Sequence, residues 1–174
     1  MTAQLRLVIT KDDMDSPSPV DAAVIEQDTQ LLLDPFSDIK HVPEPYAKLI
    51  EQGMQSLKSN NVPPGSVLVR RGTPLKLLAV VHDINLEPSW REEWVAEALQ
   101  EIFGIVAKRR LTSIAMPMLG TVHGRLAPQR FIDMLGKAYR GGDVSCLKHV
   151  WIFAPADIDG EVVEYFFEQH PGTL

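Results

Sequence analysis

The sequence predicts a single α/β domain in which a central sheet lies between two layers of helices, a three-layer α/β/α arrangement. Short apolar runs rich in β-branched residues, typical of strands buried on both faces, alternate with segments whose apolar residues recur every three or four positions. The second pattern is that of a helix with one buried face. Since 174 residues is the size of one domain, we expect residues 1–174 to form one unit.

Six apolar runs have the length of strands. The first two, residues 5–10 and 21–26, are separated by a segment with two prolines, and residues 34–45 contain three prolines and no clear period, so we expect loops there. The other four occur in the second half of the chain, where they alternate with helical patterns. They are residues 67–70, 75–82, 113–117 and 149–154.

Four segments have helical spacing: residues 46–57, 94–106, 131–139 and 162–167. Ser89 and Glu92 have the S-x-x-E spacing of a capping box, which predicts that the long second helix starts there. Its expected core face includes Trp94, Leu99, Ile102 and Phe103, and Gly141–Gly142 is expected to end the third helix.

Composition excludes several classes of protein. The chain is 45% hydrophobic and 23% charged, as in ordinary globular proteins, and no apolar stretch approaches the roughly 20 residues that cross a bilayer. The start MTAQLRLVITKDDMD lacks the apolar region of a secretory signal, so we expect a cytoplasmic protein. One cysteine, Cys146, allows no internal disulfide, and the five histidines lack metal-site spacing, so no metal or cofactor is expected.

Charge is distributed unevenly along this acidic chain. Residues 104–150 carry eight basic and two acidic residues, a net +6, whereas the rest of the chain carries −12. A positive sector on an acidic protein favours a small anion over a nucleic acid or a membrane. Solvated faces of two helices explain the same pattern equally well.

Residues 113–131, SIAMPMLGTVHGRLAPQRF, are the most informative stretch. A buried strand runs into a glycine-bearing loop, and Pro128, a favoured first-turn residue, opens the helix that follows. Ligands of open α/β sheets bind at the carboxyl ends of strands. Gly120 and Gly124 allow close approach to the main chain, and backbone N–H groups beside a helix start bind anions.

Three side chains of this loop add to the predicted anion site. Thr121 offers a hydroxyl donor, Arg125 a guanidinium suited to phosphate, and His123 an imidazole that titrates near neutrality. The alternative is a plain strand-to-helix turn whose glycines serve geometry alone.

SIAMPMLGT resembles the phosphate-loop segment of macro domains, which reads like SIAxPxLGTG. Three more segments match in the same order: residues 65–75 resemble the GSvvvTpGgnL hairpin, 78–83 the yviHav strand and 150–153 the last strand. The resemblance covers about residues 62–168. It implies a macro-domain-like fold, a mixed sheet between layers of helices, that binds ADP-ribose or a related nucleotide-sugar diphosphate and sometimes hydrolyses it.

The chain also departs from that pattern. Residues 21–25 resemble the start of the DaiVNaaN strand, but Ile25 and Asp28 stand where asparagines are expected, and the glycine run that normally follows is absent. Val122 and Arg125 occupy glycine positions of the loop. Because a β-branched residue is costly at positive φ, we expect the loop backbone to differ there.

Four residues outside the loop, His82, Asp83, Cys146 and Phe153, are of types that can bind a ligand or catalyse a reaction. His82 and Asp83 could form an acid–base pair, but adjacent strand residues point to opposite faces, so His82 is expected to be a hydrogen-bonded core histidine. Cys146 is expected to be a core residue, whereas Phe153 has the position and the ring to stack on an adenine. The predicted ligand-binding set is Gly120, Thr121, Val122, His123, Gly124, Arg125, Asp21 and Phe153, with no catalytic residue identified.

Three functions remain open. The first is a module that binds ADP-ribose or another nucleotide phosphate, free or on an ADP-ribosylated protein, through the loop of residues 120–125. The second is a macro-like scaffold that has lost nucleotide binding and acts through protein contacts. The third, an ADP-ribosyl hydrolase, lacks a candidate residue to position water.

Overall fold

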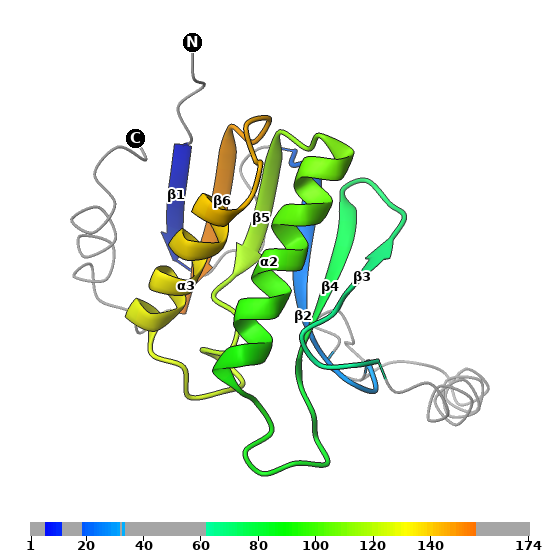
Figure 1. Cartoon of the computed structure of the whole chain (residues 1–174), viewed down its shortest axis with the longest axis vertical. Coiled ribbons are helices and arrows are strands. Elements are labelled where there is room, and N and C mark those ends of the chain that lie inside the picture. The colour runs from blue at the N-terminus through cyan, green and yellow to red at the C-terminus, as the bar shows by residue number, and fades with distance from the viewer. Residues whose placement is uncertain (1–5, 12–18, 32, 34–61, 156–174) are drawn as a thin grey trace.

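The computed structural model describes residues 6–11, 19–31, 33 and 62–155 of the chain (Figure 1). These residues form one sheet with two helices packed against it. The predicted helices at residues 46–57 and 162–167 and the loop at 34–45 lie outside the described residues. No helix among the described ranges is long and apolar enough to cross a membrane.

The sheet has six strands in the order β1-β6-β5-β2-β4-β3. All neighbouring strands are parallel except β3 and β4, which form an antiparallel hairpin at one edge. The predicted mixed sheet is therefore confirmed. The strands are β1 (Arg6–Lys11), β2 (Ala22–Asp28), β3 (Val67–Arg70), β4 (Leu75–His82), β5 (Ser113–Pro117) and β6 (His149–Ala154).

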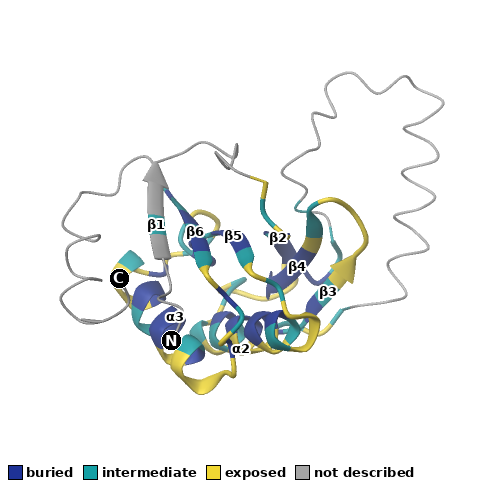
Figure 2. Cartoon of the chain, turned by 90° about the horizontal axis from the view of Figure 1, so that it is seen from above, coloured by how far each residue is buried: buried dark blue, intermediate teal, exposed yellow. Residues whose placement is uncertain are grey.

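Helices α2 (Glu92–Arg109) and α3 (Pro128–Gly141) cover the same face of the sheet (Figure 2). Their apolar faces and the facing strand residues form one buried cluster. Pro128 opens α3 and Gly142 follows its last residue, as the sequence predicts. The α/β prediction is thus confirmed, with both described helices in one layer.

Strand β5 lies in the middle of the sheet, between β6 and β2. Ile114 and Met116 are fully buried, which confirms the prediction of an interior strand. The apolar run of β5 has no polar alternation because both of its lateral neighbours are strands and helices cover its face.

The start and the core face of α2 differ from the prediction in two details. Arg91, not Ser89, precedes the first helical residue, and no side chain caps the helix. The Ser89 carbonyl instead accepts the amide of Asp83 at 2.7 Å, and Trp90 forms a β-bridge with His82, so these two residues pair with the end of β4. Trp94 is only half-buried, and the guanidinium of Arg91 lies over its ring at 5.3 Å. Leu99, Ile102 and Phe103 are buried as predicted.

Candidate functional site

The loop of residues 118–127 lies where parallel strands end together. It leaves the carboxyl end of β5 and leads directly into α3 (Figure 1). The parallel neighbours β2 and β6 end at the same edge of the sheet. The loop therefore occupies the position at which open α/β sheets bind ligands.

Gly120 is the point about which this loop turns. Its φ is +76°, a conformation that favours glycine. Its carbonyl accepts the amide of Leu126 at 3.1 Å, which closes residues 120–126 into a compact loop. The hydroxyl of Thr121 donates to the Met118 carbonyl at 2.6 Å. The Thr121 proton expected for a ligand is thus committed within the loop.

Gly124 packs directly against the start of the loop. A methyl group at its Cα would lie 2.4 Å from the Gly120 carbonyl oxygen and 2.9 Å from the ring of Trp90. Gly124 does not have a positive φ; Gly120 is the loop's one residue that does. Glycine is therefore needed at position 124 for close packing and at position 120 for its backbone angle.

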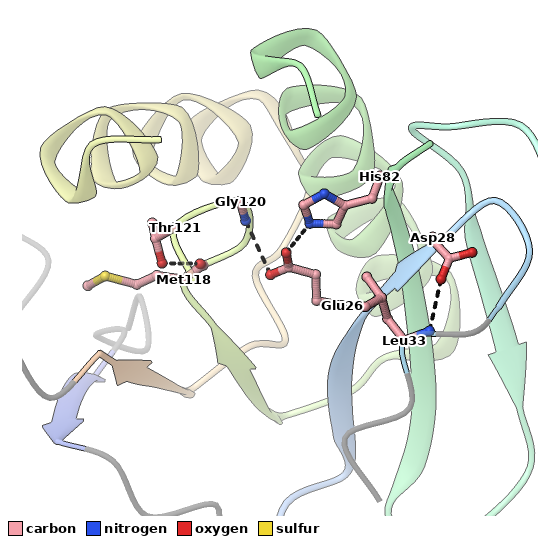
Figure 3. Close-up of polar contacts among 7 residues, drawn as sticks. All are labelled: Glu26, Asp28, Leu33, His82, Met118, Gly120 and Thr121. Atoms are coloured by element: carbon pink, nitrogen blue, oxygen red, sulfur yellow. Dashed lines mark hydrogen bonds and ion pairs between the residues drawn. The ribbon is translucent and has the colours of Figure 1, made fainter. Parts of the chain in front are cut away.

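A buried, hydrogen-bonded pair of side chains lies behind the loop. One carboxylate oxygen of Glu26, on β2, contacts Nε2 of His82, at the end of β4, and the other oxygen accepts the amide of Gly120 at 3.2 Å (Figure 3). Glu26 is 8% and His82 2% exposed. The expectation that His82 is a hydrogen-bonded core histidine is confirmed. Glu26 was not among the predicted site residues.

The outer part of the loop carries unused backbone donors. Within the described residues, the amides of residues 122–125 donate no hydrogen bond. The side chains of Val122, His123 and Arg125 are exposed. Neither Val122 nor Arg125 has a positive φ, so the loop backbone avoids the strain that a β-branched residue would cause there. Four consecutive free N–H groups beside a helix start can hold an anion.

Phe153 and Asp21, the two predicted site residues outside the loop, lie at opposite ends of the parallel strands. Phe153 pairs with Pro117 at the end of β6, and its carbonyl accepts the amide of Met118 at 3.3 Å. The structure therefore brings Phe153 beside the loop. Asp21 precedes β2, next to the start of β5, and so lies at the far edge of the sheet from residues 120–125.

Asp21 has a structural role at that far edge. Its Oδ2 accepts the amides of Thr112 and Ser113 at 2.6 and 3.1 Å and the Thr112 hydroxyl at 2.9 Å. The hydrogen bond from the Thr112 amide is the main cause that lowers the pKa of Asp21. Asp21 thus joins β2 to the turn before β5, and the loop has no contribution from it.

The basic residues of 104–150 do not form one sector in space. Lys108 and Arg109 end α2, at the end of the helix away from the loop (Figure 1). Arg130 is close to the loop but pairs with Glu92, Nε to Oε2, at 3.0 Å. Among the loop's own residues the positive charge comes from Arg125. Lys108 and Arg109 are therefore not part of a positive sector around the loop, and their positions fit the other explanation of the pattern, solvated helix faces.

The carboxyl end of β2 carries a second buried acid. Asp28 is fully buried, and its two carboxylate oxygens accept the amides of Gln30 at 2.6 Å and Leu33 at 2.8 Å. Figure 3 shows the contact with Leu33. This carboxylate shapes the turn that follows the strand, as aspartate does in Asx turns. No group of three metal-ligating side chains occurs in the part of the chain that the structure describes.

Known proteins resemble this chain in structure but not in sequence. No protein-family model and no curated protein sequence matches the chain. The macrodomain of Oceanobacillus iheyensis with ADP is 18% identical, with a TM-score of 0.67 over 98% of this chain and 96% of that chain. The macrodomain of Thermus aquaticus DarG is 19% identical, with a TM-score of 0.62 over 85% of this chain and 97% of that chain.

These likenesses are structural, since fewer than one residue in five is identical. They extend over nearly the full length of both macrodomains. The chain has the macrodomain fold.

Proposed function

We propose that this protein is a module that binds ADP-ribose or a related nucleotide phosphate through the loop of residues 120–125. The observation that carries the proposal is a run of four amides, at residues 122–125 before α3, that donate no hydrogen bond to any residue the structure describes. Structural neighbours support the ligand class, since two O. iheyensis macrodomain structures are described with ADP and with ADPR.

Each part of the loop has a defined role in this proposal. The amides of residues 122–125 donate to phosphate oxygens, and the first turn of α3 adds the positive end of its dipole. Arg125 adds a guanidinium with the geometry to hold two phosphate oxygens. Phe153, half-buried beside the loop, offers a ring for the base to stack on.

Calorimetry with ADP-ribose, AMP and inorganic phosphate tests the proposal. We expect heat from ADP-ribose, and we expect Arg125→Ala to weaken its binding by about tenfold or more, the value of one charge-assisted hydrogen bond. Because Arg125 is exposed, the variant should unfold at the wild-type denaturant concentration. Arg110→Ala is the matched control, because it removes an exposed arginine that follows α2 at the end of that helix away from the loop.

Undiminished binding in Arg125→Ala would place the anion elsewhere. If none of the three ligands gave heat of binding, the second candidate, a macro-fold scaffold that acts through protein contacts, would be favoured. One observation favours that candidate: the Gly120 amide already has a partner inside the protein, the carboxylate of Glu26. No observation on the described residues favours hydrolysis of ADP-ribosyl groups.

A further inference from the structure

Glu26 joins the loop to the two strands beneath it. Its carboxylate is buried between β2, which carries it, β4, which supplies His82, and the loop, which supplies the Gly120 amide (Figure 3). A buried amide without an acceptor costs free energy, and a carboxylate is the strongest acceptor that a side chain offers. The start of the loop is therefore fixed to the sheet.

Gly120 transmits this attachment to the rest of the loop. Its amide is held by Glu26, and its carbonyl holds the amide of Leu126. Gly124 packs against the same carbonyl. The orientation of residues 121–125 thus depends on where Gly120 is held.

A ring contact is the second link between the buried pair and the loop. The ring of His82 meets the ring of His123 edge-on, with centroids 6.1 Å apart. His123 is exposed and His82 is buried. The imidazole that holds Glu26 therefore also touches the part of the loop whose amides are free.

We propose that Glu26 is a positioning residue, held by His82, that fixes the loop so that the amides of residues 122–125 face one anion together. The proposal rests on the proposed function, because it assigns Glu26 a role at the same site. Glu26 itself does not touch the ligand. Pre-organised donors bind more tightly, because no free energy is lost in ordering them when the ligand arrives.

Two substitutions separate positioning from general support. Glu26→Ala removes the acceptor of the Gly120 amide, so we expect ADP-ribose to bind at least about tenfold more weakly, measured by calorimetry where the variant is fully folded. Glu26→Gln keeps an oxygen for Gly120, and its amide nitrogen can donate to Nε2 of His82 when the neutral imidazole carries its proton on Nδ1. It should therefore restore binding to within about threefold of wild type. A residue that only supports the fold would change the unfolding midpoint without changing the affinity of the folded protein.

Glu101→Ala is the matched control. The Glu101 carboxylate also accepts a backbone amide, that of Val67 at 2.9 Å, but it connects α2 with β3 away from the loop. It should leave the affinity for ADP-ribose unchanged. If Glu26→Ala does not fold, Glu26→Asp, whose side chain is one methylene shorter, replaces it with the same expected loss.

Amide resonances give a readout that needs no ligand. In nitrogen–proton correlation spectra, the Gly120 resonance and those of residues 122–125 should move in Glu26→Ala and stay close to wild type in Glu26→Gln. Wild-type affinity in a folded Glu26→Ala would overturn the positioning role. If wild type binds no ADP-ribose, the proposed function fails, and the spectra alone decide: unmoved resonances at 122–125 in Glu26→Ala would refute the positioning role too.

Discussion

Asp21 illustrates how a residue of a recognisable motif can serve a different part of the fold. The sequence predicts that Asp21 binds the ligand, because Asp21 begins a stretch that resembles a macro-domain motif. The start of a parallel strand, however, lies at the opposite end of the sheet from the loops that follow the carboxyl ends. Its carboxylate instead accepts backbone amides of Thr112 and Ser113. The pKa of Asp21 is therefore lower than its ordinary value of 3.8.

A lowered pKa makes Asp21 a pH-dependent contributor to stability. We expect Asp21→Asn to reduce the free energy of unfolding at neutral pH by about 1 kcal/mol, a low value for a charged hydrogen bond because solvent screens this exposed group. Asp21 stabilises fully above its unfolded pKa, and that stabilisation is lost as pH falls through the lower folded pKa. Urea titrations from neutral pH downward should therefore show the two proteins converging at acid pH. A constant difference would contradict the role.

Gly124 and Gly104 should respond oppositely to the same substitution. Gly124→Ala would place a methyl group against the Gly120 carbonyl and the Trp90 ring, and we expect it to destabilise the protein by about 1–3 kcal/mol, as overpacking does. Gly104 lies within α2 with open space around it, so Gly104→Ala should stabilise by about 1 kcal/mol. Thermal unfolding measures both. A neutral Gly124→Ala would show that the loop relaxes freely.

Which site residues could be predicted depended on how local their signals are. The loop of residues 120–125 has glycines, a preceding strand and a following proline, all visible in one stretch of sequence. Glu26 is joined to Gly120 across 94 positions and to His82 across 56, and neither spacing follows a local rule. A signal was present nonetheless: Glu26 is an acid inside an apolar strand pattern, and such a charge needs a buried partner.

At the scale of elements, strands were easier to predict than the helix start. The last four strands have the predicted bounds, and the first two differ by one or two residues. Three of the last four, β4, β5 and β6, are interior strands, which are apolar throughout. The start of α2 was placed too early. Its capping-box residue Ser89 is used in a β-type contact, which is a tertiary interaction that overrides a local pattern.

The packing of α2 against α3 gives a prediction at this scale. Phe103 is 1% exposed, and its ring meets that of Tyr139 edge-on at 6.0 Å. We expect Phe103→Ala to reduce the free energy of unfolding by about 3–5 kcal/mol because it leaves a cavity. Burial raises the pKa of Tyr139 above its ordinary value of 10.0, so the variant should also bring that pKa closer to 10.0 in an absorbance titration.

The exposed Gln100 of the same helix provides the control for this change. Gln100→Ala should alter the denaturation midpoint only slightly, since surface changes seldom exceed about 0.5 kcal/mol. Equal midpoints for Phe103→Ala and Gln100→Ala would contradict the assignment of that helix face to the core.

At the scale of the whole molecule, the order of strands connects distant parts of the chain. β1, near the start, pairs with β6, near residue 150, and β2 lies between β5 and β4. Alternating strand and helix patterns predict such a sheet, but the order within it arises from long-range pairing. Charge is distributed in space by the same pairing, since Lys108 lies in the last turn of α2 whereas Arg130 pairs with Glu92 in the first turn of that helix.

A sheet with this order cannot be divided into two consecutive halves that each keep their own strands together. We therefore expect the protein to unfold in one cooperative transition, with calorimetric and van't Hoff enthalpies equal. ADP-ribose at a hundred times its dissociation constant should stabilise that transition by about 2.7 kcal/mol, because it binds the folded state alone. Arg125→Ala should lose this shift at the same ligand concentration while keeping the single transition. Two separate transitions would contradict a single domain, whereas one transition that ADP-ribose does not move would contradict binding and leave the single domain intact.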